Sequence, residues 1–184
     1  WVDTQMEQTA GKTKVGTATK VDVQNWTVAR TVALPQINMN NPHNMWTDRS
    51  QRLIYQTEWF DSKLTVFERE TGKFVRRVSV GEAPSHVMTR TDTDAVHVAL
   101  NGEQGPQSVV ELSPGANSVQ RRVDIGRGHP HAHWMSADGK TMVTPNAFTA
   151  DSSIFDFPSN HTTSIVPTGA IAIATGMMPD SRSE

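Results

Sequence analysis

Apolar and polar residues alternate along this chain in stretches of five to nine residues, the pattern of strands with one buried face. Turn residues such as Asp61-Ser62 and Thr71-Gly72 separate the stretches. Between residues 43 and 125 the pattern predicts two successive groups of four strands. The predicted strands cover residues 16–24, 26–34, 43–47, 53–59, 64–69, 74–80, 86–90, 95–100, 108–112 and 119–125.

A short motif recurs along the chain: a histidine or its substitute, Met two residues later, and then Asp. Its copies begin at His43, His86, His133 and Thr175, which are 43, 47 and 42 residues apart. An alternating stretch precedes each copy, and two of these stretches contain a doubled arginine. The chain is therefore built from about four related units, because self-similarity at a fixed period of this size marks a repeat architecture.

Four short strands per unit of about 44 residues indicate an all-β fold, the β-propeller with four-stranded blades. We expect a single propeller domain, or a fragment of one, over residues 1–184. Either the chain is part of a larger ring, which the interrupted last unit favours, or its final residues complete the first unit of a closed four-bladed ring. The predicted units are residues 1–40, 41–83, 84–128 and 129–171, with 172–184 starting the next.

Composition supports strands over helices and excludes several functions. The chain has 21 Thr and 19 Val against 5 Leu, which favours pleated structure. Its 17 basic and 19 acidic residues are spread evenly, so no nucleic-acid footprint is visible, and no apolar run approaches the roughly 18 residues of a membrane span. The absence of cysteine excludes thiolate metal sites and Cys-linked haem, and no hydrolase motif is present.

Residues 63–75, KLTVFERETGKFV, followed by VSVGEAPSH at 78–86, resemble the YVTN type of β-propeller repeat. The resemblance covers about residues 17–182 and implies a seven-bladed, extracytoplasmic protein, periplasmic or extracellular. The chain is similar to the propellers of nitrous oxide reductase and thiocyanate dehydrogenase, whose channel histidines bind copper, and to the haem-binding propeller of cytochrome-type nitrite reductase. It has no adjacent His-His pair and no copper-binding Cys domain, unlike nitrous oxide reductase.

The histidines near the start of each unit are the candidate metal ligands, because the innermost strands of propeller blades line a shared channel. Counting from the preceding glycine selects His131 in the third copy, whereas counting back from Met and Asp selects His133. Alternate residues of a strand share a face, so both remain candidates. Converging imidazoles suit copper or zinc better than calcium or magnesium. The predicted metal ligands are His43, His86, His131 and His133.

Other residues are weaker candidates for chemistry. A Met facing the channel would favour Cu(I), although core packing is the alternative for Met45, Met88, Met135 and Met177. His97 and His161 are expected to be packed or solvated, and Trp46, Trp59 and Trp134 to pack between blades. Glu58 and Asp151 could serve as a base or an extra ligand, with solvated carboxylates as the alternative.

Two classes of function therefore remain. In the first, the chain is a propeller whose channel histidines bind copper, as the site of a copper-dependent oxidoreductase acting on a small molecule. In the second, it is a scaffold or interaction propeller without chemistry, or a subunit of a larger redox complex whose partner supplies the cofactor. Protein partners or further blades are expected in either case, and the sequence identifies no catalytic residue.

Overall fold

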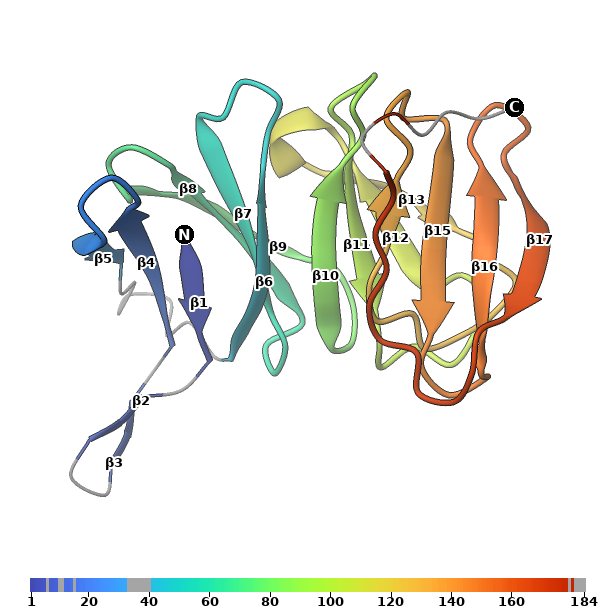
Figure 1. Ribbon diagram of the computed structural model, residues 1–184, viewed down its shortest axis with the longest axis horizontal. Helices are drawn as coiled ribbons and strands as arrows, with labels where there is room; N and C mark the ends of the chain where they lie inside the picture. Colours follow the sequence, from blue (N-terminus) through green and yellow to red (C-terminus); the bar gives the residue numbers. More distant parts are fainter. Residues whose placement is uncertain (6, 10–11, 15, 33–40, 179, 181–184) are drawn as a thin grey trace.

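The computed structural model describes residues 1–5, 7–9, 12–14, 16–32, 41–178 and 180 of the 184-residue chain. These residues form successive antiparallel sheets that stand side by side in chain order (Figure 1). The sheets do not close into a ring within this described part of the chain. The fold is all-β and propeller-like, with one short 3₁₀ turn, η1 (Pro114–Ala116).

The first sheet is incomplete, and each of the following three has four strands. The strands of the first sheet are β1 (Val2–Thr4), β4 (Thr17–Asp22) and β5 (Thr27–Val32). In the chain, a separate hairpin of β2 (Glu7–Thr9) and β3 (Lys12–Lys14) comes between β1 and β4. The second sheet contains β6 (Pro42–Thr47), β7 (Leu53–Glu58), β8 (Lys63–Glu68) and β9 (Phe74–Ser79). The third contains β10 (Pro84–Thr89), β11 (Val96–Leu100), β12 (Val109–Leu112) and β13 (Val119–Val123), and the fourth contains β14 (Trp134–Met135), β15 (Thr141–Asn146), β16 (Asp151–Asp156) and β17 (His161–Pro167).

The strand prediction is confirmed where the alternation is strongest. All eight strands predicted between residues 43 and 125 form, with ends displaced by no more than two residues. The strands predicted at 16–24 and 26–34 form as β4 and β5, and the end of the second, at 33–34, lies outside the described residues. Pro179 of the last motif copy and residues 181–184 also lie outside them.

The Asp of the repeated motif organises the turn between the first two strands of a sheet. Asp48 accepts backbone N–H bonds from Arg52 and Leu53 at 2.7 and 2.8 Å. Asp138 accepts hydrogen bonds from the Lys140 N–H at 3.1 Å and from a nearby serine hydroxyl at 2.6 Å. An Asp side chain that bonds the backbone a few residues on stabilises a tight turn, so these two copies have a structural role.

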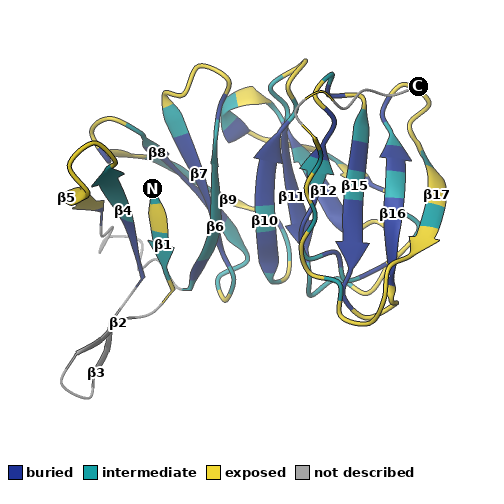
Figure 2. Cartoon of the chain, in the orientation of Figure 1, coloured by how far each residue is buried: buried dark blue, intermediate teal, exposed yellow. Residues whose placement is uncertain are grey.

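The hydrophobic core lies between neighbouring sheets (Figure 2). Each sheet packs its apolar side chains against the next, so every interface is built from two units of the repeat. The interfaces combine Ala18 and Val32 with Ile54 and Phe67, Tyr55 and Val66 with Val98 and Val110, and Val109 and Val123 with Met142 and Phe155. All of these side chains are buried.

Residues 172–178, predicted to start a further unit, form no strand. The segment leaves β17 and returns over β15 and β16, where Ala172, Ala174 and Thr175 line a hollow together with Val143 and Ile154. A strand requires backbone pairing with a neighbouring strand, and this path over side chains does not supply it. Within the described residues, no helix has the length and apolar character needed to cross a membrane.

We expect Met142→Ala to lower the free energy of unfolding by about 2–5 kcal/mol, because the substitution removes a fully buried side chain from the interface between the third and fourth sheets. The matched control is Met178→Ala, whose side chain is 73% exposed and whose loss should change stability by less than about 0.5 kcal/mol. Urea unfolding measures both. Similar losses in the two variants would contradict the assignment of the core to the sheet interfaces.

Candidate metal centre

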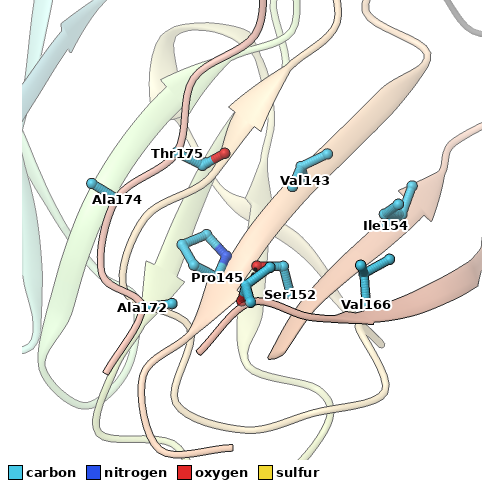
Figure 3. Close-up of a pocket in the computed structure, with 9 residues that line it drawn as sticks. Val143, Pro145, Ser152, Ile154, Val166, Ala172, Ala174 and Thr175 are labelled. Atoms are coloured by element: carbon cyan, nitrogen blue, oxygen red, sulfur yellow. Dashed lines mark hydrogen bonds between the residues drawn. The ribbon is translucent and has the colours of Figure 1, made fainter. Parts of the chain in front are cut away.

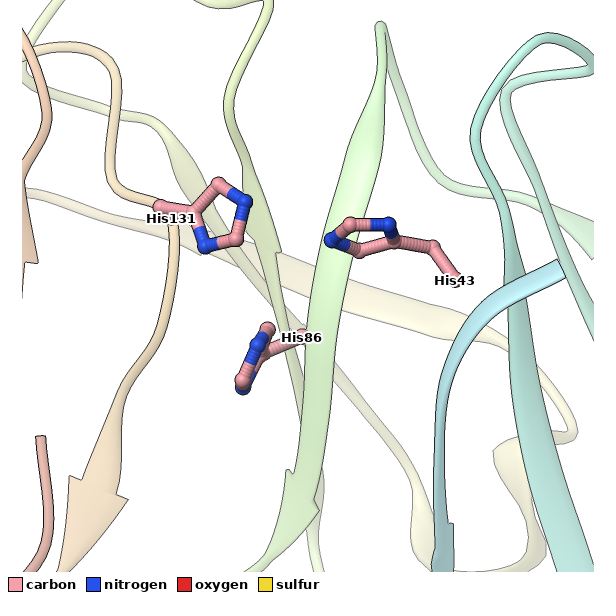
Figure 4. A group of neighbouring side chains, drawn as sticks. All are labelled: His43, His86 and His131. Carbon is pink, nitrogen blue, oxygen red and sulfur yellow. The ribbon is translucent and has the colours of Figure 1, made fainter. Parts of the chain in front are cut away.

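Three imidazoles from three different sheets meet near the ends of the innermost strands (Figure 4). His43 lies in β6, His86 in β10, and His131 just ahead of β14. Their ring centroids are 5.1 Å apart for His43 and His131, 5.4 Å for His86 and His131, and 6.1 Å for His43 and His86. One nitrogen from each ring lies within 4.8 Å of the other two, close enough for the three side chains to serve one metal site.

Strand register shows how the three histidines reach the same place. A proline marks the start of pairing in each innermost strand: Pro42 opposite Glu58, Pro84 opposite Leu100, and Pro130 opposite Asn146. His43 and His131 directly follow this proline, whereas His86 comes one residue later and Ser85 takes the equivalent position. A register shift follows the proline in β6 and β10, so strict alternation of side chains does not apply there.

Polar side chains join the three innermost strands beside the histidines. The Thr57 hydroxyl donates to the Ser85 carbonyl at 2.6 Å, and the Asn44 side-chain oxygen accepts from the Val87 N–H at 3.0 Å. The Ser85 hydroxyl in turn donates to the carbonyl of His131. The backbone positions that carry the imidazoles are therefore hydrogen-bonded from sheet to sheet, which limits how far they can move relative to one another.

Three groups outside the innermost strands contact the imidazoles. The backbone carbonyl of Ile173 lies 2.9 Å from Nδ1 of His131, and the side-chain amide of Gln5 lies 2.8 Å from Nδ1 of His43. The Trp59 ring packs with its centroid 4.9 Å from that of His43 and 6.1 Å from that of His131. Both contacts orient a ring, and the carbonyl at Nδ1 of His131 leaves Nε2 of that ring available to a metal.

Partial burial keeps the three imidazoles uncharged near neutral pH. Burial, with a smaller contribution from His131, lowers the pKa of His43 to about 4. Burial lowers the pKa of His86 to about 4 as well, assisted by His131 and His43, and it lowers the pKa of His131. Neutral imidazole is the form that binds metals, so no proton has to be displaced at neutral pH.

His133, the other candidate in the third motif copy, lies outside the group of three. Its ring is buried, neither ring nitrogen has a hydrogen-bond partner among the described residues, and burial lowers its pKa well below 6.5. The backbone before β14 is irregular, with a positive φ of 55° at His129. Residues 131–133 themselves are in no strand, so the alternation that would place His131 and His133 on the same face does not apply to them.

Three of the four methionines of the motif pack in the interfaces between sheets. Met88 and Met135 are buried in the interface between the third and fourth sheets. Met45 is partly buried against the interface between the first and second sheets. These three thioethers are therefore part of the hydrophobic interior, and the side chains of the candidate centre are the three imidazoles.

The two carboxylates considered as extra ligands are engaged in ion pairs. Glu58 is buried and bonded to the Arg77 guanidinium and the Thr65 hydroxyl. Asp151 accepts a hydrogen bond from Arg127 at 2.9 Å. Each carboxylate is therefore paired with an arginine and not with the three imidazoles.

The remaining candidate histidines have separate environments. His97 is fully buried, its Nε2 lies 3.0 Å from Glu111 Oε2, and its ring packs on Phe157. His161, at the start of β17, is exposed. These positions agree with the expectation that both residues are packed or solvated.

Sequence reasoning did not assign Gln5, Trp59 or Ile173 to the centre. The pairing of β6 with β7 could have indicated Trp59. Pro42 pairs with Glu58, so Trp59, which follows Glu58, must lie beside the start of β6. Trp59 also donates its backbone N–H to Asn41 at 3.0 Å. A backbone carbonyl such as that of Ile173 has no sequence signature, and only the path of the chain reveals its contact.

The sequence matches no protein-family model and no curated protein. The structure is similar to a chain of Kuenenia stuttgartiensis hydrazine synthase, with a TM-score of 0.70 and 18% sequence identity over 82% of this chain and 42% of that chain. The chain thus spans less than half the length of that hydrazine synthase chain. At this identity the likeness shows the fold alone, and it confirms the propeller-like all-β architecture.

We expect the metal-free protein to lose stability as the pH falls from about 6.5 to about 4. An unfolded histidine titrates near pH 6.5, whereas the folded pKa of His43 and His86 is about 4. Between these values the unfolded chain binds more protons, so acid favours unfolding, and the loss is complete only below the folded pKa. Urea unfolding at several pH values, with a chelator present, measures this dependence.

The double variant His43→Asn/His86→Asn should show a weaker pH dependence over this range than the native chain. His161→Asn is the control, because that side chain is exposed. If the double variant and the native chain lose stability in parallel as the pH falls, the two imidazoles do not have the depressed pKa described above.

Proposed function

We propose that His43, His86 and His131 bind copper, and that the chain belongs to an extracytoplasmic propeller whose copper site carries out a redox reaction on a small molecule. The observation that carries this proposal is the convergence of three uncharged imidazoles, one nitrogen of each within 4.8 Å of the others, from three separate sheets. The periplasmic or extracellular location rests on the resemblance of residues 63–86 to YVTN repeats.

The donor set favours copper among the common metals. All three donors are imidazole nitrogens, which suit copper and zinc, whereas calcium and magnesium require oxygen ligands. Between these two, nitrogen sites bind Cu(II) more tightly than Zn(II). Copper would supply one-electron chemistry at the centre, and the protein would supply the fixed positions of the imidazoles.

The surroundings of the three histidines suit a small reactant. Each imidazole is only partly buried, so the group is accessible from solvent while the sheets hold it on one side. The Trp59 ring forms an apolar wall against His43 and His131. This combination of an accessible metal, rigid ligands and one aromatic wall supports binding of a small molecule beside the metal.

We expect each of His43→Ala, His86→Ala and His131→Ala to lower copper affinity by more than about 100-fold, since loss of a ligand should exceed the 10–100-fold effect of an outer-shell change. The measurement is competition with a chromophoric copper chelator, using protein from which any affinity tag has been removed. His161→Ala is the control, because its side chain is exposed and remote from the group. If the native chain binds no copper, or if all four variants bind it equally, the proposal fails and the scaffold function takes its place.

Copper bound at this centre should also quench tryptophan fluorescence, mainly that of Trp59, because its ring packs against His43. We expect Trp59→Phe to remove most of the Cu(II)-dependent quenching while copper affinity stays within about threefold. Trp26→Phe, which changes a ring that is 80% exposed, should retain the quenching. Quenching that survives in Trp59→Phe and disappears in Trp26→Phe would place the copper elsewhere.

A further inference from the structure

The segment that follows β17 returns across the fourth sheet to the candidate centre (Figure 1). Its start is anchored, because the backbone N–H groups of Thr168 and Gly169 donate to the Ala150 carbonyl at 3.0 and 3.3 Å. The Thr168 hydroxyl lies 3.1 Å from that of Ser152. The path of the segment toward the histidines is thus defined from its first residues.

Further along, the segment lies over the apolar side chains of β15, β16 and β17 (Figure 3). Ala172 and Ala174 share a hollow with Val143, Ile154 and Val166. Ile173 lies between these two alanines in the chain, so its position depends on how the two alanines pack on the sheet. The contact at the centre is therefore connected to the packing of the fourth sheet.

The contact between Ile173 and His131 has only one chemical interpretation. A backbone carbonyl can only accept a hydrogen bond, so the nitrogen 2.9 Å away, Nδ1 of His131, must carry the hydrogen. In the neutral ring this leaves Nε2 with a free electron pair. By contrast, the Gln5 amide can present either its oxygen or its nitrogen to His43, so that contact does not define the tautomer.

We propose that the Ile173 carbonyl is a positioning group for the metal centre: it holds His131 as the Nδ1–H tautomer and aims Nε2 at His43 and His86. This inference rests on the proposed copper site. Metal-binding histidines commonly donate their second ring N–H to a carbonyl or carboxylate, which fixes both the tautomer and the ring orientation. Copper affinity therefore depends on how residues 168–175 pack on the fourth sheet.

The test weakens this carbonyl without changing any side chain. L-Lactic acid in place of Ala174 converts the peptide bond after Ile173 into an ester, whose carbonyl is a poorer acceptor. L-Lactic acid in place of Ala172 is the matched control, because it makes the same change two residues earlier. The chain has no cysteine, so a synthetic peptide of residues 170–184 can be ligated through a cysteine at position 170 that is then desulfurised to the native Ala170.

Two readouts are measured on the full-length chain. All seven histidines lie within residues 1–169, so this recombinant part carries the ¹⁵N-histidine label, and NMR of the metal-free protein reports the tautomer of His131. We expect the Nδ1–H form in the native chain, an increased Nε2–H fraction in the Ala174 ester, and copper affinity lowered by about tenfold in that ester. The Ala172 ester should match the native chain in both.

The positioning role is overturned if the Ala174 ester keeps the native tautomer and an affinity within twofold, or if the Ala172 ester changes both to the same extent. Failure of the copper proposal is distinguishable from this. A native chain that binds no copper would refute the proposed function, whereas the tautomer of His131 in the metal-free protein still decides whether the Ile173 carbonyl positions the ring.

Discussion

Burial of apolar side chains between neighbouring sheets holds this fold together. A four-stranded sheet of this kind has apolar residues on both faces, and only the adjoining sheets can remove them from water. Tyr55 and Val66 are buried by the third sheet, and Val109 and Val123 by the fourth. Every unit thus relies on the next for its stability, as in other repeat architectures.

The same packing assembles the candidate centre. His43, His86 and His131 are far apart in sequence, and their rings lie within 5.1–6.1 Å of one another only because the innermost strands of three sheets lie side by side. Hydrogen bonds through Thr57 and Ser85 then hold these strands together at that point. The spacing of the imidazoles is consequently a property of the sheet interfaces and not of any local segment.

Burial has a second effect, which concerns charge. Three protonated imidazoles at this distance would repel one another, and their partial removal from water also disfavours the charged form. Both effects act in the same direction and lower the pKa of His43 and His86 to about 4. The imidazoles of His43 and His86 are therefore uncharged at neutral pH, and their protonation in acid lowers the stability of the fold.

The all-β class and the four-strand unit could be predicted from the sequence, because alternation of apolar residues and turn chemistry are local. The repeated motif also predicted His43, His86, His131 and His133 as candidate metal ligands. Only the folded chain places His131 in the group and His133 apart from it, since residues 131–133 are in no strand and do not alternate as a strand would. Likewise, the contact of the Ile173 carbonyl depends on the path of the chain over the fourth sheet, where backbone atoms carry no residue-specific signal.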